Sequence, residues 1–122
     1  MKKPILIMFS MIAFIAFITV QSANAQDKTE PWPGVTKKVL VDNDKVNVSE
    51  VTFAVGAVAT WHSHPQYTVY AMTDVKMQVE EKDKKTIVAE LKAGQAMYSP
   101  AVTHQTSNVG KKPFTVIVTE IK

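Results

Sequence analysis

Alternating apolar and polar residues run from Val35 to the end of the chain, and this period-two pattern limits the fold more than any other feature. β-branched residues recur through it, and no stretch shows the 3.6-residue period of a helix. We therefore predict an all-β domain over residues 35–122. The predicted strands are Lys37–Val41, Val46–Val55, Thr60–His64, Tyr67–Met72, Val75–Glu81, Thr86–Leu91, Thr103–Asn108 and Phe114–Ile121.

Short polar segments at 42–44, 82–85 and 110–113 separate several of these strands and are typical of tight turns. This many short strands in fewer than a hundred residues favours a sandwich or a barrel. The jelly roll, which protects the edges of its two sheets, is the architecture that we predict.

The first 25 residues have the three parts of a signal peptide: the basic start Met1-Lys2-Lys3, the apolar run Ile5–Val20 and the small-residue site Ala23-Asn24-Ala25. We predict cleavage after Ala25, export to the periplasm or medium, and no membrane anchor on the mature protein. The alternative is an uncleaved anchor, although the apolar run falls short of the roughly 20 residues that span a bilayer. A lipoprotein anchor is excluded because the chain has no cysteine.

Residues 26–34 carry two prolines and a glycine and show little periodicity. We predict an irregular N-terminal arm that Trp32 holds against the domain; a disordered tail is the alternative.

The composition of the 97 residues that follow the predicted cleavage site limits which partners, metal ligands and substrates are expected. They hold 12 lysines and 11 acidic residues, a net charge of +1, so no nucleic-acid partner is expected. Without cysteine, any metal must be bound through nitrogen and oxygen. Without arginine, the bidentate clamp that proteins use for phosphates is missing, which argues against phosphorylated substrates.

The chain's three histidines form a pattern that favours metal binding. His62 and His64 are two residues apart, so on a strand both imidazoles lie on one face and can chelate one ion. His104 is in a separate predicted strand, which a barrel can bring to the same interior point. Ordinary strand histidines bonded to water or backbone are the alternative interpretation.

Two segments that contain these histidines, GAVATWHSHPQYT and GQAMYSPAVTHQTSN, resemble the first and second motifs of the cupin superfamily. The resemblance spans residues 56–108, most of the predicted domain. The matching positions are Gly56, His62 and His64 in the first motif, and Gly94, Pro100, His104 and Asn108 in the second.

The resemblance implies a cupin jelly-roll barrel with a divalent metal ion on the three histidines. It also implies a glutamate ligand, but this chain has Thr68 at that position and Val69 at the alternative spacing. Asp74 replaces the glycine that commonly closes the first motif, and the second motif is one residue short between Pro100 and His104. Cupin barrels commonly form homodimers through their outer strands, and the same assembly is expected here.

Further site candidates follow from the same period-two argument. Gln66 is a candidate auxiliary ligand because it shares the parity of the two first histidines, provided that Pro65 does not break the strand. The candidates for pocket lining are Thr68, Tyr70, Met72, Thr106 and Asn108, although such residues more often simply fill a core. The one acidic residue within the two motifs is Asp74, which a turn position explains, so we identify no catalytic acid or base.

Three neutral imidazoles would leave a divalent ion with an open coordination position. This resembles the three-histidine iron dioxygenases of the cupin superfamily and implies a small, neutral, mostly apolar substrate that chelates through two oxygens. Zinc or nickel acting as a Lewis acid or a source of hydroxide is an alternative. The candidate divalent ions are therefore iron, zinc, nickel and manganese. The other hypotheses are a non-catalytic binding module of the cell envelope and an ion that only stabilises the fold.

Overall fold

The computed structural model describes residues 28–29 and 31–122, so the predicted signal peptide lies outside the described residues. All of the regular structure in this part of the chain is β. The strands are β1 (Lys28–Thr29), β2 (Val35–Asp42), β3 (Val46–Phe53), β4 (Val58–His64), β5 (Tyr67–Ala71), β6 (Val75–Glu81), β7 (Ile87–Leu91), β8 (Ala96–Ser99), β9 (Val102–Asn108) and β10 (Phe114–Ile121). Among the described residues, no helix is long and apolar enough to cross a bilayer.

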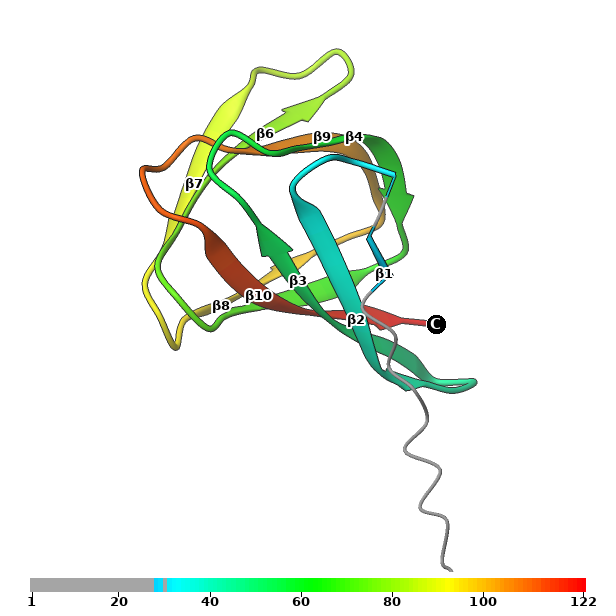
Figure 1. Cartoon of the computed structure of the whole chain (residues 1–122). Helices are drawn as coiled ribbons and strands as arrows, with labels where there is room; N and C mark the ends of the chain where they lie inside the picture. The colour runs from blue at the N-terminus through cyan, green and yellow to red at the C-terminus, as the bar shows by residue number, and fades with distance from the viewer. Residues whose placement is uncertain (1–27, 30) are drawn as a thin grey trace, which may run out of the picture.

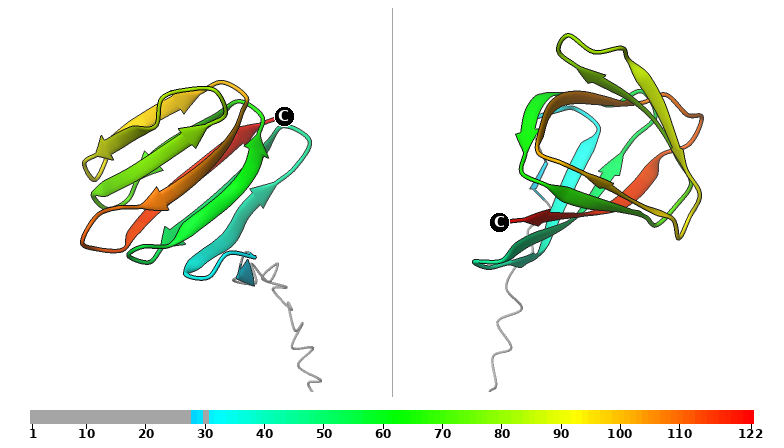
Figure 2. Two further views of the ribbon diagram at one scale, coloured as in Figure 1. Left: turned by 90° about the horizontal axis from the view of Figure 1, so that it is seen from above. Right: turned by 180° about the vertical axis from the view of Figure 1, so that it is seen from behind.

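The strands form two antiparallel sheets that curve around a common interior (Figure 1). One sheet has the order β1-β2-β3-β10-β5-β8, and the other has the order β4-β9-β6-β7. Neighbours such as β4 and β9 are far apart in sequence, as jelly-roll connections require. The views from above and behind show strands of each sheet running side by side around this interior (Figure 2). The predicted all-β fold with antiparallel sheets is confirmed.

The predicted strands match the observed ones closely, with Val75–Glu81 and Phe114–Ile121 reproduced in full. Two strands were not predicted. The first, β1, lies inside the segment expected to be irregular, where its two residues pair with Thr36 and Lys37. The second, β8, has only four residues and lies between the turn at Gly94 and a proline, so it was too short for a period-two pattern to stand out.

The apolar core lies between the sheets and is concentrated in the middle of the barrel. Phe53 and Phe114 stack with ring centroids 4.8 Å apart, and Val35, Val69 and Val116 are buried with them. Burying a side chain of this size stabilises the fold by about 1.5–3 kcal/mol. Beside this core the interior stays open as a cavity of about 450 Å³. The fold therefore encloses a space large enough for a small molecule.

Candidate metal centre

A β-bulge in β4 positions the first histidine. Ala59 pairs with Thr106 of β9 and His62 pairs with His104, so β4 has one more residue than β9 between these two pairs. The extra residue resets the alternation of side chains, and Ala59 and His62 therefore both face the cavity. Bulges near functional sites commonly redirect a side chain in this way.

The bulge also fixes the orientation of the His62 ring. Nδ1 of His62 donates a hydrogen bond of 2.7 Å to the backbone oxygen of Thr60, which leaves Nε2 of the neutral ring with its lone pair. The hydroxyl of Thr60 accepts a hydrogen bond, also 2.7 Å, from the indole nitrogen of Trp32. The Trp32 ring lies 5.0 Å from the His62 ring. The expected contact of Trp32 with the domain thus falls directly beside the first histidine.

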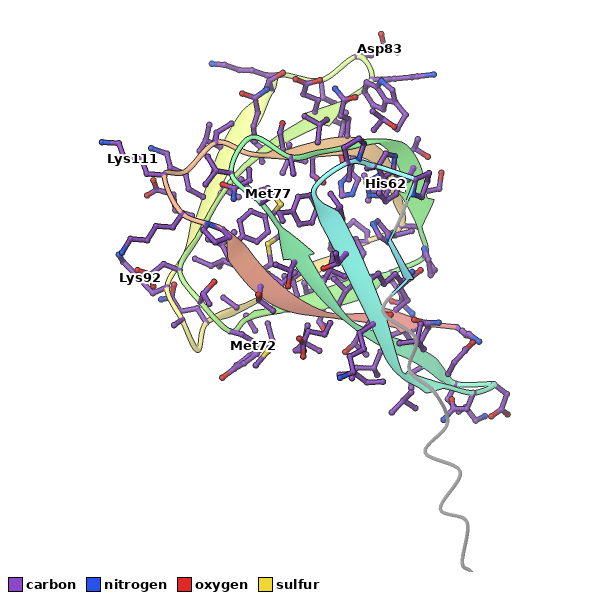
Figure 3. All side chains as sticks on the ribbon, viewed as in Figure 1. His62, Met72, Met77, Asp83, Lys92 and Lys111 are labelled. Carbon is purple, nitrogen blue, oxygen red and sulfur yellow. The ribbon has the colours of Figure 1, made fainter. Side chains whose placement is uncertain are left out.

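The structure brings the three histidines together, as the sequence predicted. Their ring centroids are 4.7 Å apart for His62 and His104, 4.8 Å for His62 and His64, and 5.1 Å for His64 and His104. One ligand nitrogen from each ring lies within 4.8 Å of the other two. Figure 3 shows His62 on β4, directed toward the interior beneath the second sheet.

The spacing of two ring nitrogens fits one edge of a metal coordination shell. Nε2 of His62 and Nε2 of His104 are 3.1 Å apart. With metal–nitrogen bonds of about 2.0–2.1 Å, two ligands are about 2.9 Å apart at a right angle and about 3.4 Å apart at a tetrahedral angle. The observed separation, at which the two rings are also within hydrogen-bond distance, falls between these limits, so the spacing of this pair fits a shared divalent ion.

The third ring carries an unsatisfied nitrogen. Nδ1 of His64 is buried and has no hydrogen-bond partner among the described residues. The carboxylate of Glu120 is 3.8 Å away, which is longer than a hydrogen bond. A buried polar atom without a partner costs about 1–3 kcal/mol. Coordination of an ion by this nitrogen would offset this cost, and the donor set of three imidazoles fits a metal.

Burial keeps two of the imidazoles neutral. It lowers the pKa of His64 to about 4, with further contributions from the neighbouring histidines and Lys37. Burial also lowers the pKa of His104 to about 4, although Glu81 opposes the shift. The Tyr67 ring, 4.6 Å from the ring of His64, helps to shield it from water. Only the neutral ring offers a lone pair to a metal, so the site is ready to bind at neutral pH.

Among the predicted lining residues, Thr106 is buried and faces the cavity. The predictions for Thr68, Tyr70 and Met72 are wrong, because these residues lie on the outer face of β5 and its following turn. Tyr70 and Met72 are 46% and 49% exposed, and Figure 3 shows Met72 outside the barrel while Met77 of β6 points inward.

The reason is a break in the strand at Pro65 and Gln66. The prediction continued the alternation from His64 through this point, but β4 ends there and β5 belongs to the other sheet. The alternation restarts, so Tyr67 and Val69 face inward instead. Gln66 itself is exposed and accepts a hydrogen bond of 3.1 Å from Tyr98, so it is not placed as a ligand.

Asn108 is buried, as expected, but it has a structural part rather than lining the cavity. Its side-chain nitrogen donates to the backbone oxygens of Phe53 and Lys112, and its side-chain oxygen accepts from the backbone nitrogen of Gly110. These bonds fix the loop before β10.

Two carboxylates at the cavity were missed because they lie outside the motifs. Glu81 ends β6, and Glu120 lies near the end of β10. Each continues an inward-facing alternation, through Val79 in β6 and through Val118 in β10. Strand parity could have identified both residues, but knowing that they approach the histidines requires the strand order. The cavity therefore has acidic groups, contrary to what the motifs alone suggested.

Comparisons of sequence and structure identify known proteins that this chain is similar to. No protein-family model matches the chain. It is 37% identical over 94 residues to the beta-alanine degradation protein BauB of Pseudomonas aeruginosa, a match that covers 74% of this chain and 96% of the relative. A cupin domain from Bordetella pertussis Tohama I is 29% identical, with a TM-score of 0.69 over 77% of this chain and 99% of that one. A cupin-like protein from Thermotoga maritima shares the fold at 24% identity, with a TM-score of 0.62 over 79% and 76% of the two chains.

The lowered histidine pKa values predict a pH-dependent stability for the metal-free protein. In the unfolded chain a histidine titrates near 6.5, so between pH 6.5 and 4 the unfolded state binds more protons than the folded state. The contribution of these neutral histidines to the free energy of unfolding is then fully present above pH 6.5 and decreases as the pH drops toward 4. We expect a loss on the order of 2–4 kcal/mol between pH 7.5 and 5.0, measured by urea denaturation in EDTA. Replacing His64 by glutamine should reduce this loss. An unchanged pH dependence in this variant would contradict the assignment of the loss to the lowered pKa of His64.

Proposed function

We propose, given that this chain belongs to the cupin superfamily, that it binds one divalent metal ion through His62, His64 and His104 and takes a small molecule in the adjoining cavity. The observation that carries the proposal is the convergence of three ligand nitrogens within 4.8 Å at the edge of that cavity. The buried nitrogen of His64 without a partner supports it further.

Three imidazoles without thiolate suit iron, zinc, nickel or manganese rather than a soft ion. Bound there, such an ion supplies a Lewis-acid centre with open coordination positions, at which a substrate oxygen or dioxygen can be activated. We propose that the substrate is small and mostly apolar and chelates the ion through two oxygens. The apolar side chains that line the cavity, among them Val69, Phe114 and Val116, suit such an apolar body.

We further propose that the protein is a metal-dependent enzyme of dioxygenase-like character. The sequence motifs offered no acid or base, whereas the folded cavity has Glu120, whose carboxylate lies 3.8 Å from Nδ1 of His64. A carboxylate within reach of the substrate can accept or return a proton during the reaction. Apolar side chains in the wall lower the effective dielectric constant, which strengthens electrostatic interactions inside the cavity.

Metal binding should stabilise the native state, because an ion that binds only the folded protein raises its free energy of unfolding. We expect iron(II), nickel, zinc or manganese to raise the melting temperature of the wild-type protein by several degrees, measured by thermal denaturation with and without EDTA. The His104→Ala variant should lose this shift. As a matched control, Gln105→Ala changes the next residue on the outer face and should retain it. An equal shift in His104→Ala and wild type would contradict the site.

The enzymatic proposal is tested by oxygen uptake of the iron-loaded protein. Diketones and catechol-like compounds are the first substrates, and β-alanine joins them because the relative from Pseudomonas aeruginosa is named for its degradation. We expect uptake with at least one chelating substrate and none with His62→Ala. Binding of these compounds without turnover, across the iron, nickel, zinc and manganese forms, would instead support a non-catalytic binding module.

Export is a further proposal, which rests on the signal-peptide pattern of residues 1–25. Expressed with its native start in a Gram-negative host, the protein should appear in the periplasmic fraction. Mass spectrometry should give a mature N-terminus at Gln26. Ala25→Pro, which blocks processing at small-residue sites, should retain the leader, and an intact N-terminus on the wild-type protein would contradict cleavage.

A further inference from the structure

The histidine site lacks a carboxylate ligand from the strand that follows it. At the two positions where the motif resemblance would place a glutamate, the chain has Thr68 on the outer face and Val69 facing the cavity. Neither side chain can ligate a metal strongly. A protein carboxylate must therefore reach the ion from another strand if the site has one.

Register places Glu81 beside the histidines. In the sheet order β4-β9-β6, His62 is the direct partner of His104, and His104 is in turn the direct partner of Glu81. Direct partners in neighbouring antiparallel strands project from the same face, with their Cβ atoms about 4.5–5.5 Å apart. The three side chains thus form a row across three strands, and all of them face the cavity.

The present partner of Glu81 holds it only weakly. The ammonium group of Lys84 lies 3.0 Å from the carboxylate, but this lysine is 69% exposed, in the turn between β6 and β7. Ion pairs exposed to this degree contribute little, because water and salt screen them. The Glu81 side chain is only 28% exposed, and it lines the cavity. A divalent cation bound beside His104 can therefore compete with Lys84 for the Glu81 carboxylate.

We propose that Glu81 supplies a carboxylate oxygen to the ion on the three histidines and so replaces the missing motif glutamate from a different strand. This inference rests on the proposed metal site. It adds a fourth protein ligand and lowers the net charge of a divalent site from +2 to +1. Lys84 then competes with the ion for the same carboxylate.

Cobalt(II) titration tests this ligand without any assay of activity. The visible absorption of bound cobalt(II) reports the number and kind of its ligands. Competition with a chelator gives the affinity of the protein for cobalt(II). We expect Glu81→Gln to weaken cobalt binding by about tenfold or more and to change the visible spectrum. Lys84→Gln should leave the spectrum unchanged and tighten binding by a few-fold. The matched control is Glu80→Gln, since Glu80 faces outward and bonds Gln78 and Gln105; its binding should equal that of the wild type.

The outcomes separate this inference from the proposed function. Cobalt affinity within twofold of the wild type in Glu81→Gln, with an unchanged spectrum, would overturn the role of Glu81 and leave the three-histidine site standing. Absence of cobalt binding to the wild-type protein would overturn both. Glu81→Asp keeps the charge but shortens the side chain by one methylene. It should give an intermediate affinity and a shifted spectrum, and it serves as the test should Glu81→Gln not fold.

Discussion

The pairing of β4 with β9 is the interaction on which the site depends. It sets His62 opposite His104, and the bulge between Ala59 and His62 turns the second half of β4 so that its histidines face the interior. The same bulge presents a backbone oxygen that fixes the ring of His62. Ring position, ring orientation and the choice of ligand nitrogen therefore come from one local irregularity of the backbone.

The environment of the rings complements this geometry. Burial disfavours the protonated form of His64 and His104, so their lone pairs are available at neutral pH. Tyr67 covers one ring and Trp32 lies beside another. Apolar core residues form much of the cavity wall. The histidines and carboxylates that line the cavity gather near the ends of β4, β6 and β10.

Sequence patterns predicted most strands, the antiparallel architecture and the convergence of the histidines. They succeeded where alternation runs unbroken, as in Val75–Glu81, because period two is a direct consequence of strand geometry. They failed where the chain changes sheets. Pro65 indicates that the strand can end there, but the sequence does not show that the alternation restarts with the opposite parity. Tyr70 was therefore assigned to the inside of the barrel, although it lies outside.

The bulge in β4 is the opposite case: it was not predicted from the sequence, yet the prediction for the histidine pair was still correct. His62 and His64 both follow the bulge, so the alternation between them is undisturbed and the pair was correctly assigned to one face. Glu81 and Glu120 were missed for another reason. Their side-chain direction follows from sequence, but their proximity to the histidines depends on which strands are neighbours, and a jelly roll makes neighbours of strands that are distant in the chain.

That separation along the chain also bears on how the protein would acquire an ion at this site. His62 and His104 meet across 42 residues, and Trp32 reaches Thr60 across 28. Contacts of this range form late, because long loops must close before they are made. A nascent or partly folded chain offers an ion only the neighbouring pair of imidazoles. Selection among competing ions would then fall to the finished barrel.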